Sequence, residues 1–403
     1  MKKNRHSSDG SLEATKGMRA CMVAYTFYES DNRVRRYAET LVKRGDHVDV
    51  IALRQERDPR HEVIEGVNVH RIQKRVINER RKIAYFLKIL LFLVNSFIRL
   101  TLKHLKNRYD LIHVHSVPDF EVFAAVIPKL TGSKVILDIH DIVPEFYASK
   151  FKSPNNSVVL KWLTMVERLS TAFADHVIIS NDIWYKTLTS RSVNEDKCTV
   201  ILNYPTDIFY KRPARGRASA RFIIIYPGTL NWHQGVDIAV KAFSIIKDRA
   251  PEAEFHIYGD GESKEALMNL VLQLGLEGRV LFNGILPLEG IADIMGRSDL
   301  GVVPKRANAF GNEAFSTKIL EFMALGVPVI VSRTKIDQFY FNDSLVTFFK
   351  PDDEKDLAEK MLLLMTDTKL REKTTSNALK FIDKNSWSIK KKIYLDIVDS
   401  LLG

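Results

Sequence analysis

Residues 305–333 read KRANAFGNEAFSTKILEFMALGVPVIVSR and contain two glutamates, Glu313 and Glu321, eight positions apart. The letters around Glu313, GNEAFST, are rich in Gly, Asn and Ser, which predicts a loop. Apolar residues follow at helical spacing up to Gly326, which predicts a helix that contains Glu321, and residues 327–331 predict a short buried strand. One carboxylate is therefore expected in front of a helix N-terminus and the other within that helix.

This arrangement suits a sugar attached to a nucleoside diphosphate. Ser316 or Thr317 can cap the helix, and the free backbone N–H groups of the loop and of the first helical turn can bind a diphosphate. Glu313 can accept hydrogen bonds from sugar hydroxyls, and Glu321 from a ribose diol. Two cations of the same segment can oppose the phosphate charge: Lys305 and Lys318. A capped surface helix with two solvated glutamates explains the spacing alone equally well.

The composition is that of a globular protein with two domains. A chain of 403 residues is long for one domain, and 45% of it is hydrophobic. Cys21 and Cys198 lie far apart and have no metal-type spacing, which suits a reducing compartment. Residues 1–17, MKKNRHSSDGSLEATKG, lack an apolar core, so we expect a disordered tail and not a signal peptide.

The net charge of +11 is concentrated in one segment. Residues 74–108 contain ten Lys or Arg and one acidic residue, which is a net charge of +9. A nucleic-acid-binding protein usually spreads its basic residues over a groove-facing surface. Here the basic segment is also the most apolar one, so we expect no nucleic-acid partner.

Residues 83–105 are predicted to form a helix within this segment. Their longest uncharged run, residues 89–98, has ten residues, whereas a membrane-spanning helix needs about 20. The sequence therefore predicts that the helix does not cross a bilayer. A polar edge runs along it at about 100° per residue: Lys88, Asn95, Arg99, Lys103 and Lys106.

Two interpretations of this helix carry equal weight, and both can be partly true. A wide apolar face with a basic edge can lie on an anionic lipid surface. We would then expect a cytoplasmic protein held peripherally on the inner face of the plasma membrane. The other interpretation is a domain helix that packs its apolar face on its own sheet.

Strand and helix patterns alternate along the chain. An apolar run at 18–25, a helix at 33–45 and a second strand at 48–53 indicate a parallel sheet with helices on its faces. Further strands are predicted at residues 111–115, 134–139, 174–180, 222–226, 254–258, 280–282 and 300–303. The predicted fold class is α/β.

The segment EAFSTKILE followed by FMALGVPVI, residues 313–330, resembles the E-x7-E signature of retaining family-4 glycosyltransferases of the GT-B fold. The resemblance implies two Rossmann-like domains whose parallel sheets face each other across a cleft. Residues 18–205 would face the acceptor and the membrane, and residues 206–385 would bind the nucleotide sugar. A helix at residues 386–403 would cross back to the first domain. LNYPTDIFY, residues 202–210, is similar to the family's interdomain linker.

The same resemblance implies which residues form the site. LDIHDIVPEFY resembles a D-x-H-D segment in which the His faces the donor sugar near the reacting carbon, so His140 is expected to be catalytic, together with Glu313. Asp138 and Asp141 are expected to orient the loop or to contact the acceptor. The expected donor-binding residues are Gly228, Thr229, Asn231, Gly259, Lys305, Asn312, Ala314, Phe315, Ser316, Thr317, Lys318 and Glu321.

Two loops depart from the family pattern. Residues 30–32, Ser-Asp-Asn, stand where many members have a Gly-Gly pair, which puts acceptor or phosphate contacts there in doubt. Thr229 and Gln234 stand where many members have an Arg and a Lys that hold the diphosphate. The available substitutes are Lys305 and Lys318, and less securely His233.

The resemblance implies retaining transfer of a hexosyl-type sugar from a nucleotide-diphosphate sugar to a hydroxyl of a lipid-linked or polysaccharide acceptor, in cell-surface glycan biosynthesis. No convincing D-x-D motif lies at a strand end, so we expect metal independence and no cofactor besides the nucleotide-sugar co-substrate. One alternative is a nucleotide-sugar epimerase on the same fold. Another is a membrane-bound partner subunit that has lost activity, which the missing Arg and Lys would explain.

Overall fold

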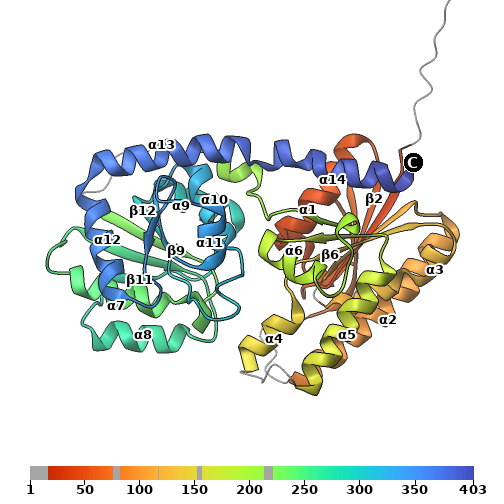
Figure 1. Cartoon of the computed structure of the whole chain (residues 1–403), viewed down its shortest axis with the longest axis horizontal. Helices are drawn as coiled ribbons and strands as arrows, with labels where there is room; N and C mark the ends of the chain where they lie inside the picture. Colours follow the sequence, from red (N-terminus) through yellow and green to blue (C-terminus); the bar gives the residue numbers. More distant parts are fainter. Residues whose placement is uncertain (1–16, 76–81, 117, 152–156, 213–220) are drawn as a thin grey trace, which may run out of the picture.

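The computed structural model describes residues 17–75, 82–116, 118–151, 157–212 and 221–403, which form two α/β halves that lie side by side (Figure 1). Each half has a parallel sheet with apolar cores on both of its faces. The α/β class is as the strand–helix alternation predicts, and the two Rossmann-like sheets are as the family resemblance implies. Of the predicted tail at residues 1–17, residues 1–16 lie outside the described residues.

The first sheet has eight strands among the described residues, in the order β3-β4-β2-β1-β5-β6-β7-β8. All neighbours pair parallel except β3 and β4, which form an antiparallel hairpin that the sequence analysis did not predict. The strands are β1 Arg19–Ala24, β2 His47–Arg54, β3 His61–Ile64, β4 Val67–Lys74, β5 Leu111–Ser116, β6 Lys134–Ile139, β7 His176–Ile179 and β8 Cys198–Val200.

The second sheet has six strands in the described residues, all parallel, in the order β11-β10-β9-β12-β13-β14. Ligands of open parallel sheets collect beyond the carboxyl ends of the strands. The strands are β9 Phe222–Pro227, β10 Ala253–Tyr258, β11 Val280–Phe282, β12 Leu300–Val303, β13 Val329–Ser332 and β14 Thr347–Phe349.

Helices cover both faces of each sheet. In the first half they are α1 Asn32–Arg44, α2 Lys82–Lys106, α3 Val126–Leu130, α4 Val143–Phe151, α5 Val158–Phe173 and α6 Asp182–Thr189, with short 3-10 turns η1 Tyr28–Ser30, η2 Asp119–Ala125 and η3 Glu195–Lys197. In the second half they are α7 Val236–Ile246, α8 Lys264–Gln273, α9 Leu288–Arg297, α10 Thr317–Leu325, α11 Lys335–Tyr340, α12 Glu354–Thr366 and α13 Thr368–Lys384, with η4 Asp207–Tyr210 and η5 Trp232–Gln234. The last helix is α14 Trp387–Leu402.

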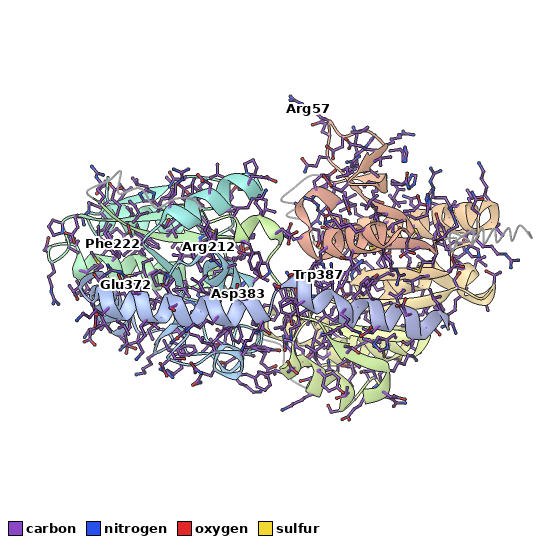
Figure 2. The ribbon with its side chains drawn as sticks, turned by 90° about the horizontal axis from the view of Figure 1, so that it is seen from above. Arg57, Arg212, Phe222, Glu372, Asp383 and Trp387 are labelled. Atoms are coloured by element: carbon purple, nitrogen blue, oxygen red, sulfur yellow. The ribbon has the colours of Figure 1, made fainter. Side chains whose placement is uncertain are left out.

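Helices α13 and α14 run across both halves (Figures 1 and 2). Phe222 and Glu372 lie at one end of this path and Trp387 where it reaches the first half (Figure 2). The indole N–H of Trp387 donates to Thr40 Oγ1 at 3.0 Å, and the Tyr394 ring lies 4.4 Å from the Tyr37 ring. Helix α14 therefore packs on α1 of the first half.

Helix α2 divides its apolar residues between two opposite faces. Ile89, Phe92 and Leu100 are buried in the core of the first sheet, and each contributes about 1.5–3 kcal/mol by leaving water. The opposite face is exposed. The packing interpretation is therefore correct for one face of the helix, and binding of the other face to lipid stays a prediction. By length and composition alone, residues Tyr85–Lys106 are long and apolar enough to cross a membrane. One face of the same helix is buried in the first half, so the prediction that it does not cross a bilayer stays a prediction.

Candidate active site

A pocket of about 360 Å³ opens between the two halves. Its lining includes His140 and Asp141, which follow β6 in the first half, and Phe315, Thr317 and Glu321, which lie just before and within α10 in the second. The remaining lining comes from the loop after β1, the first turn of α1, the segment from the end of β7 into α6, and the linker that joins the halves: Thr26, Ser30, Asp31, Asn32, Arg33, Ser180, Trp184, Asn203, Tyr204, Pro205 and Thr206. The structure therefore brings five of the predicted site residues into one space from two distant segments.

His140 is held in place from behind, at the carboxyl end of β6. Its Nε2 lies 3.2 Å from Asp138 Oδ2, and its backbone carbonyl accepts a hydrogen bond from Ser180 Oγ at 2.8 Å. The imidazole remains partly exposed, with 24% of its side chain accessible. Its ring orientation is therefore fixed while one edge faces the pocket.

Asp138 is the buried centre of this arrangement. Arg33 on α1 binds it with two hydrogen bonds, Nε to Oδ2 at 2.7 Å and Nη2 to Oδ1 at 2.6 Å, and the same guanidinium donates to the Ile201 carbonyl at 2.8 Å. His115 Nδ1 is 3.1 Å from Asp138 Oδ2. Burial favours the protonated acid, but the charge of Arg33 and the two histidines hold the pKa of Asp138 well below its ordinary value. Asp138 therefore positions His140 and does not itself face the cleft.

A second buried histidine extends this cluster towards α14. The rings of His113 and His115 stack at 4.1 Å, and His113 Nδ1 lies 3.1 Å from the Tyr394 hydroxyl. Burial lowers the pKa of both histidines, which favours neutral rings. Ligand atoms of His113, His115 and Asp138 lie within 4.8 Å of one another, as in a metal site. The Arg33 charge is bound to the same carboxylate, however, and would repel a cation placed there.

The departure at residues 30–32 has a structural cause. Asp31 caps α1, because its carboxylate accepts the backbone N–H groups of Arg33 and Val34, each at 3.1 Å. The Asp31 carboxylate thus occupies the position at the N-terminus of α1 where a phosphate could otherwise bind. A phosphate would have to displace it, so contacts of the Gly-Gly type are not available at this loop.

The ends of β9 and β10 meet with their backbones in contact. A Cβ on Gly259 would lie 1.9 Å from the Gly228 carbonyl oxygen, and the Gly228 N–H donates to the Tyr258 carbonyl at 2.8 Å. Both glycines have positive φ, 143° at Gly228 and 140° at Gly259. Only glycine fits at these two positions.

Lys318 reaches from α10 to this glycine loop. A Cβ on Gly228 would lie 2.8 Å from Lys318 Nζ, and the ammonium lies 5.6 Å from the ring centre of Tyr226. The Tyr226 hydroxyl donates to the Thr229 carbonyl at 2.9 Å and lies 3.2 Å from Gln234 Oε1. Lys318 therefore places a cation beside the two positions where the usual Arg and Lys are missing, and Tyr226 organises the loop.

Glu321 lies one helical turn after Lys318 on α10. Removal from water raises the pKa of Glu321 to about 7, although the Lys318 charge and the Thr317 hydroxyl oppose this shift. Burial likewise lowers the pKa of Lys318, against the attraction of Glu321. The two groups form an underhydrated pair at the edge of the cleft.

Lys305 is buried inside the second half, whereas the sequence analysis expected its charge to face the diphosphate. It is 5% exposed, and its ammonium lies 2.9 Å from Asp337 Oδ2 and donates to the Ala314 carbonyl at 2.6 Å. This geometry contradicts the expectation that the Lys305 charge is available to a diphosphate. The sequence could not reveal this, because Asp337 lies 32 positions further along the chain.

The loop in front of α10 is tied down by its backbone and by α11. The Glu313 carboxylate lies 2.9 Å from Lys335 Nζ, outside the lining of the cleft pocket. Asn312 Oδ1 accepts the Lys335 N–H at 3.0 Å. Ser316 occupies the N-cap of α10 but makes no capping bond, and its buried hydroxyl has no hydrogen-bond partner among the described residues. Asn231 is the N-cap of η5 and likewise makes no capping bond there.

Two contacts join the halves beside the pocket. Asn181 Nδ2 donates to the Glu313 carbonyl at 3.2 Å, and Asp182 N–H donates to the Tyr340 hydroxyl at 2.8 Å. Of these interdomain partners the sequence analysis named Glu313 but not Asn181, Asp182 or Tyr340. It also did not name Arg33, His115 or Tyr226. Their types are common in helices and strands, and only their long-range partners distinguish them.

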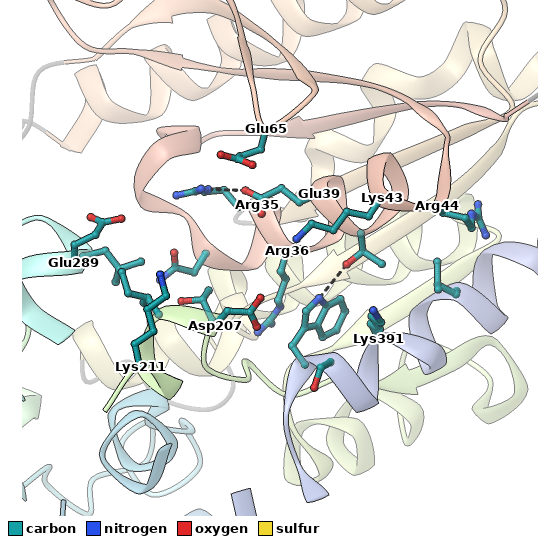
Figure 3. A pocket seen from close by; sticks show the side chains of 18 residues that line it. Arg35, Arg36, Glu39, Lys43, Arg44, Glu65, Asp207, Lys211, Glu289 and Lys391 are labelled. Atoms are coloured by element: carbon teal, nitrogen blue, oxygen red, sulfur yellow. Dashed lines mark hydrogen bonds and ion pairs between the residues drawn. The ribbon is translucent and has the colours of Figure 1, made fainter. Parts of the chain in front are cut away.

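A larger pocket, of about 610 Å³, adjoins the cleft pocket and shares Asn32 and Thr206 with it; Figure 3 shows its lining. Its walls come from α1, η4, α9 and α14, and carry both cations and carboxylates. Arg36 lies at its base, donates to the carbonyls of Tyr204 and Leu202, and lies 5.1 Å from the Trp387 ring centre. Burial lowers the pKa of Arg36 to about 10. Arg36 thus holds both chain connections between the halves.

Two Rossmann-like halves that enclose a cleft at the ends of their strands define the GT-B fold. A family model described as "Glycosyl transferases group 1" matches residues 207–381, and one described as "Glycosyl transferase 4-like domain" matches residues 30–204. The chain therefore belongs to the group 1 glycosyltransferases, as its signature segment predicts, and the protein is a glycosyltransferase.

Similar proteins agree with this assignment. An uncharacterized glycosyltransferase of Methanocaldococcus jannaschii is 26% identical over 367 residues, which cover 87% of this chain and 88% of that protein. Sucrose-phosphate synthase from Thermosynechococcus elongatus superposes with a TM-score of 0.78 at 18% identity, over 95% of this chain and 100% of that chain. Anabaena HepE, in a structure with UDP and glucose, superposes with a TM-score of 0.70 at 17% identity, over 94% and 99%. At these identities, the two structures show the shared fold.

Proposed function

We propose that this glycosyltransferase transfers a hexosyl-type sugar from a nucleotide-diphosphate sugar to a hydroxyl group, retaining the configuration of the sugar and using no metal ion. The single observation that carries the proposal is the cleft pocket, which places His140 of the first half opposite Thr317 and Glu321 of the second. One side can thus hold the nucleotide while the other faces the sugar. The UDP and glucose in the HepE structure belong to that protein and support the same class of donor here.

The donor would lie on the second half. Glu321 would accept hydrogen bonds from the ribose diol, and Lys318 would neutralise the diphosphate beside the backbone of the Gly228 loop. The N-terminus of α10, whose Ser316 cap position makes no side-chain bond, adds free N–H groups and a favourable dipole. Donors that are already in place stabilise the charge that develops on the leaving diphosphate.

The transfer would take place on one face of the sugar. The bond from the anomeric carbon to the diphosphate oxygen breaks, and the acceptor oxygen bonds to the same carbon from the same side. The acceptor's proton passes to the leaving diphosphate oxygen, so no protein base is required. His140, fixed by Asp138, would orient the sugar next to the reacting carbon, and Glu313 would contact its hydroxyls once Lys335 is displaced.

The acceptor is proposed to be lipid-linked, or a polysaccharide, in the biosynthesis of a cell-surface glycan. The basic, apolar segment around α2 belongs to the half that would bind the acceptor, which supports a site at the inner face of the plasma membrane for a cytoplasmic protein. This assignment rests on surface character, whereas the donor assignment rests on the pocket.

The test is a transfer assay with purified protein, a panel of nucleotide sugars, and lipid-linked and soluble acceptors, followed by NMR of the product's anomeric centre. We expect a product with the donor's anomeric configuration and an unchanged rate in the presence of a metal chelator. An inverted product, or complete loss of activity with the chelator, would refute the proposed mechanism. Release of an epimerised sugar nucleotide without any acceptor would instead identify an epimerase.

A further inference from the structure

The helices α2 and α5 each present an apolar stripe to solvent. On α2 the exposed residues recur at positions 87, 91, 94, 98, 102 and 105, opposite the buried stripe that packs on the sheet. On α5 they recur at 158, 162, 165 and 169. Both sets follow the i, i+4, i+7, i+11 spacing of one helical face. A helix of a soluble domain usually has one apolar stripe, which it buries. Helix α2 has a second apolar stripe, which is exposed to solvent.

The two stripes belong to one surface. Helices α2 and α5 both pack on η2, and Phe123 of η2 contacts Phe173 of α5 with ring centres 5.3 Å apart. They lie in the same region of the first half (Figure 1). The side chains are large and well exposed, for example Leu91 at 52%, Ile98 at 50%, Trp162 at 48% and Leu169 at 52%. Exposed large apolar side chains on two helices that pack on the same element are typical of an interaction site.

The residues around the two stripes are basic, which indicates an anionic partner. The sequences of α2 and α5 contain one acidic residue between them, Glu167, which is buried and bound to Arg191. Exposed cations stand beside the stripes, among them Arg99 and Lys106 on α2 and Lys161 and Arg168 on α5. Large apolar side chains bordered by cations, with Trp162 among them, match the acyl and headgroup regions of an anionic bilayer.

The chain connects this surface directly to the active site. The His140 loop leads into α4, and α5 follows α4, so that the exposed stripe begins 18 residues after the catalytic histidine. Phe146 on α4 contacts Phe310 of the second half with ring centres 5.2 Å apart. A lipid held at α5 would therefore lie near α4, the helix that follows the His140 loop and contacts the second half.

We propose that α2 and α5 together form the membrane-binding surface, with the α5 stripe inserted beside that of α2 into an anionic leaflet. This inference rests on the proposed function, because a membrane surface serves an enzyme whose acceptor is lipid-linked. It adds to that function a specific pair of helices and a specific class of lipid. It differs from the expectation based on residues 83–105, because α5 carries no charge cluster in the sequence and would supply four of the ten exposed apolar positions named above.

The test is flotation of the full chain with vesicles of phosphatidylcholine alone or mixed with phosphatidylglycerol, at low and high salt. We expect binding to the mixed vesicles that decreases with salt. The α5 variant Trp162→Gln/Leu169→Gln and the α2 variant Leu91→Gln/Ile98→Gln should each weaken it about tenfold or more, because each removes two inserted apolar side chains. The matched control is Met268→Gln/Leu272→Gln on α8, which removes two equally exposed apolar side chains from the second half and should change nothing.

A fluorescence measurement keeps the test independent of folding. Trp162→Phe should bind vesicles as the wild type does, but should lose the blue shift of emission that insertion of Trp162 produces. An α5 variant that binds like the α8 control, or a wild type that binds no vesicles, would overturn the proposal. A wild-type dimer in solution that the α5 variant dissociates would assign the surface to a second copy and would also overturn it.

Nucleotide binding separates this failure from failure of the transferase proposal. Thermal shift with nucleoside diphosphates is measured on the same preparations. Stabilisation by a nucleotide without vesicle binding would refute the membrane surface alone, whereas vesicle binding without any nucleotide effect would refute the transferase proposal alone.

Discussion

Asp138 in the first half and Glu321 in the second are carboxylates at the same cleft, and their environments are opposite. Asp138 is fully buried, bound twice by Arg33 and contacted by two histidines, so that its pKa is held well below the ordinary value. Glu321 lines the pocket, and loss of water raises its pKa to about 7. The Asp138 carboxylate thus has all its partners within the protein. The Glu321 carboxylate lacks hydrogen-bond donors that a bound nucleotide sugar would supply.

The difference separates positioning groups from binding groups. A carboxylate whose hydrogen bonds are already made within the protein fixes its neighbours, and its removal disturbs the fold. A carboxylate that is poorly hydrated and poorly partnered gains its interactions from the substrate, and its removal disturbs affinity. The same distinction applies to the two lysines, because Lys305 is bound to Asp337 whereas Lys318 lies against the open glycine loop.

The largest effect is expected from Asp138→Asn. It leaves the buried Arg33 charge without its carboxylate, which should lower the free energy of unfolding by about 3–5 kcal/mol. Urea unfolding measures this. The matched control is Asp141→Asn in the loop that follows β6. Burial raises the pKa of the Asp141 carboxyl, so a neutral side chain there should lower the free energy of unfolding only slightly. Equal losses in the two variants would show that the Arg33–Asp138 pair has no special role.

Lys305→Met should rank next, and should act on stability. The change leaves Asp337 buried without its cation and frees the Ala314 carbonyl, for a loss of about 3 kcal/mol in the free energy of unfolding. Lys318→Met serves as the control and should leave the unfolding midpoint nearly unchanged. If Lys305→Met instead kept full stability and lost only donor affinity, the expectation drawn from the sequence would be right and the structural assignment wrong.

Lys318→Met should act on the donor. A charge-assisted contact to phosphate is lost, so Kd for a nucleoside diphosphate should rise about tenfold or more, while a nucleoside without phosphates should be unaffected. Isothermal calorimetry with both ligands checks this. An unchanged affinity for the diphosphate would show that Lys318 does not replace the Arg and Lys that hold the diphosphate in other family members.

The smallest effect concerns pH. The pKa of Glu321 is raised, so the folded protein holds this proton more tightly than the unfolded chain, and its contribution to stability declines as pH rises from about 4.5 to about 7. Hydrogen-bond acceptance from the ribose favours the ionised form, so donor affinity should rise several-fold between pH 6 and 8. Glu321→Gln should remove this dependence. A wild-type affinity that is flat over this range would mean that Glu321 does not bind the ligand in its ionised form.

Much of the fold was predictable because its signals are local. Long apolar runs mark the buried parallel strands, and the helix with Glu321 ends at Gly326, whose φ of 69° glycine adopts without strain. The β3–β4 hairpin was missed. Its turn, Glu65-Gly66, has positive φ at both positions, and Glu is not a usual residue for such a turn.

The site was predictable only in part. Thr317 and Glu321, which the signature segment predicts as donor-binding residues, line the cleft pocket, and Lys318 lies beside the glycine loop. Their spacing on one helix fixes their relative positions. Arg33 was not identified, since it lies in a basic helical run and its partner Asp138 is 105 residues away. Lys305 was misassigned for the same reason. Partners distant in sequence decide whether a charged residue binds substrate or holds the fold.

The central claim is that the second half binds a nucleoside diphosphate through α10. The measurement is a thermal-shift titration of wild type and Glu321→Ala with UDP, GDP, ADP and TDP and their sugars. Bound ligand stabilises in proportion to ln(1 + [L]/Kd), so one nucleotide series should raise the wild-type Tm. Glu321→Ala should weaken that binding by about 1.5–3 kcal/mol, the worth of a hydrogen bond to a charged group. Stabilisation by none of the nucleotides, or equal stabilisation of both proteins, would contradict the account.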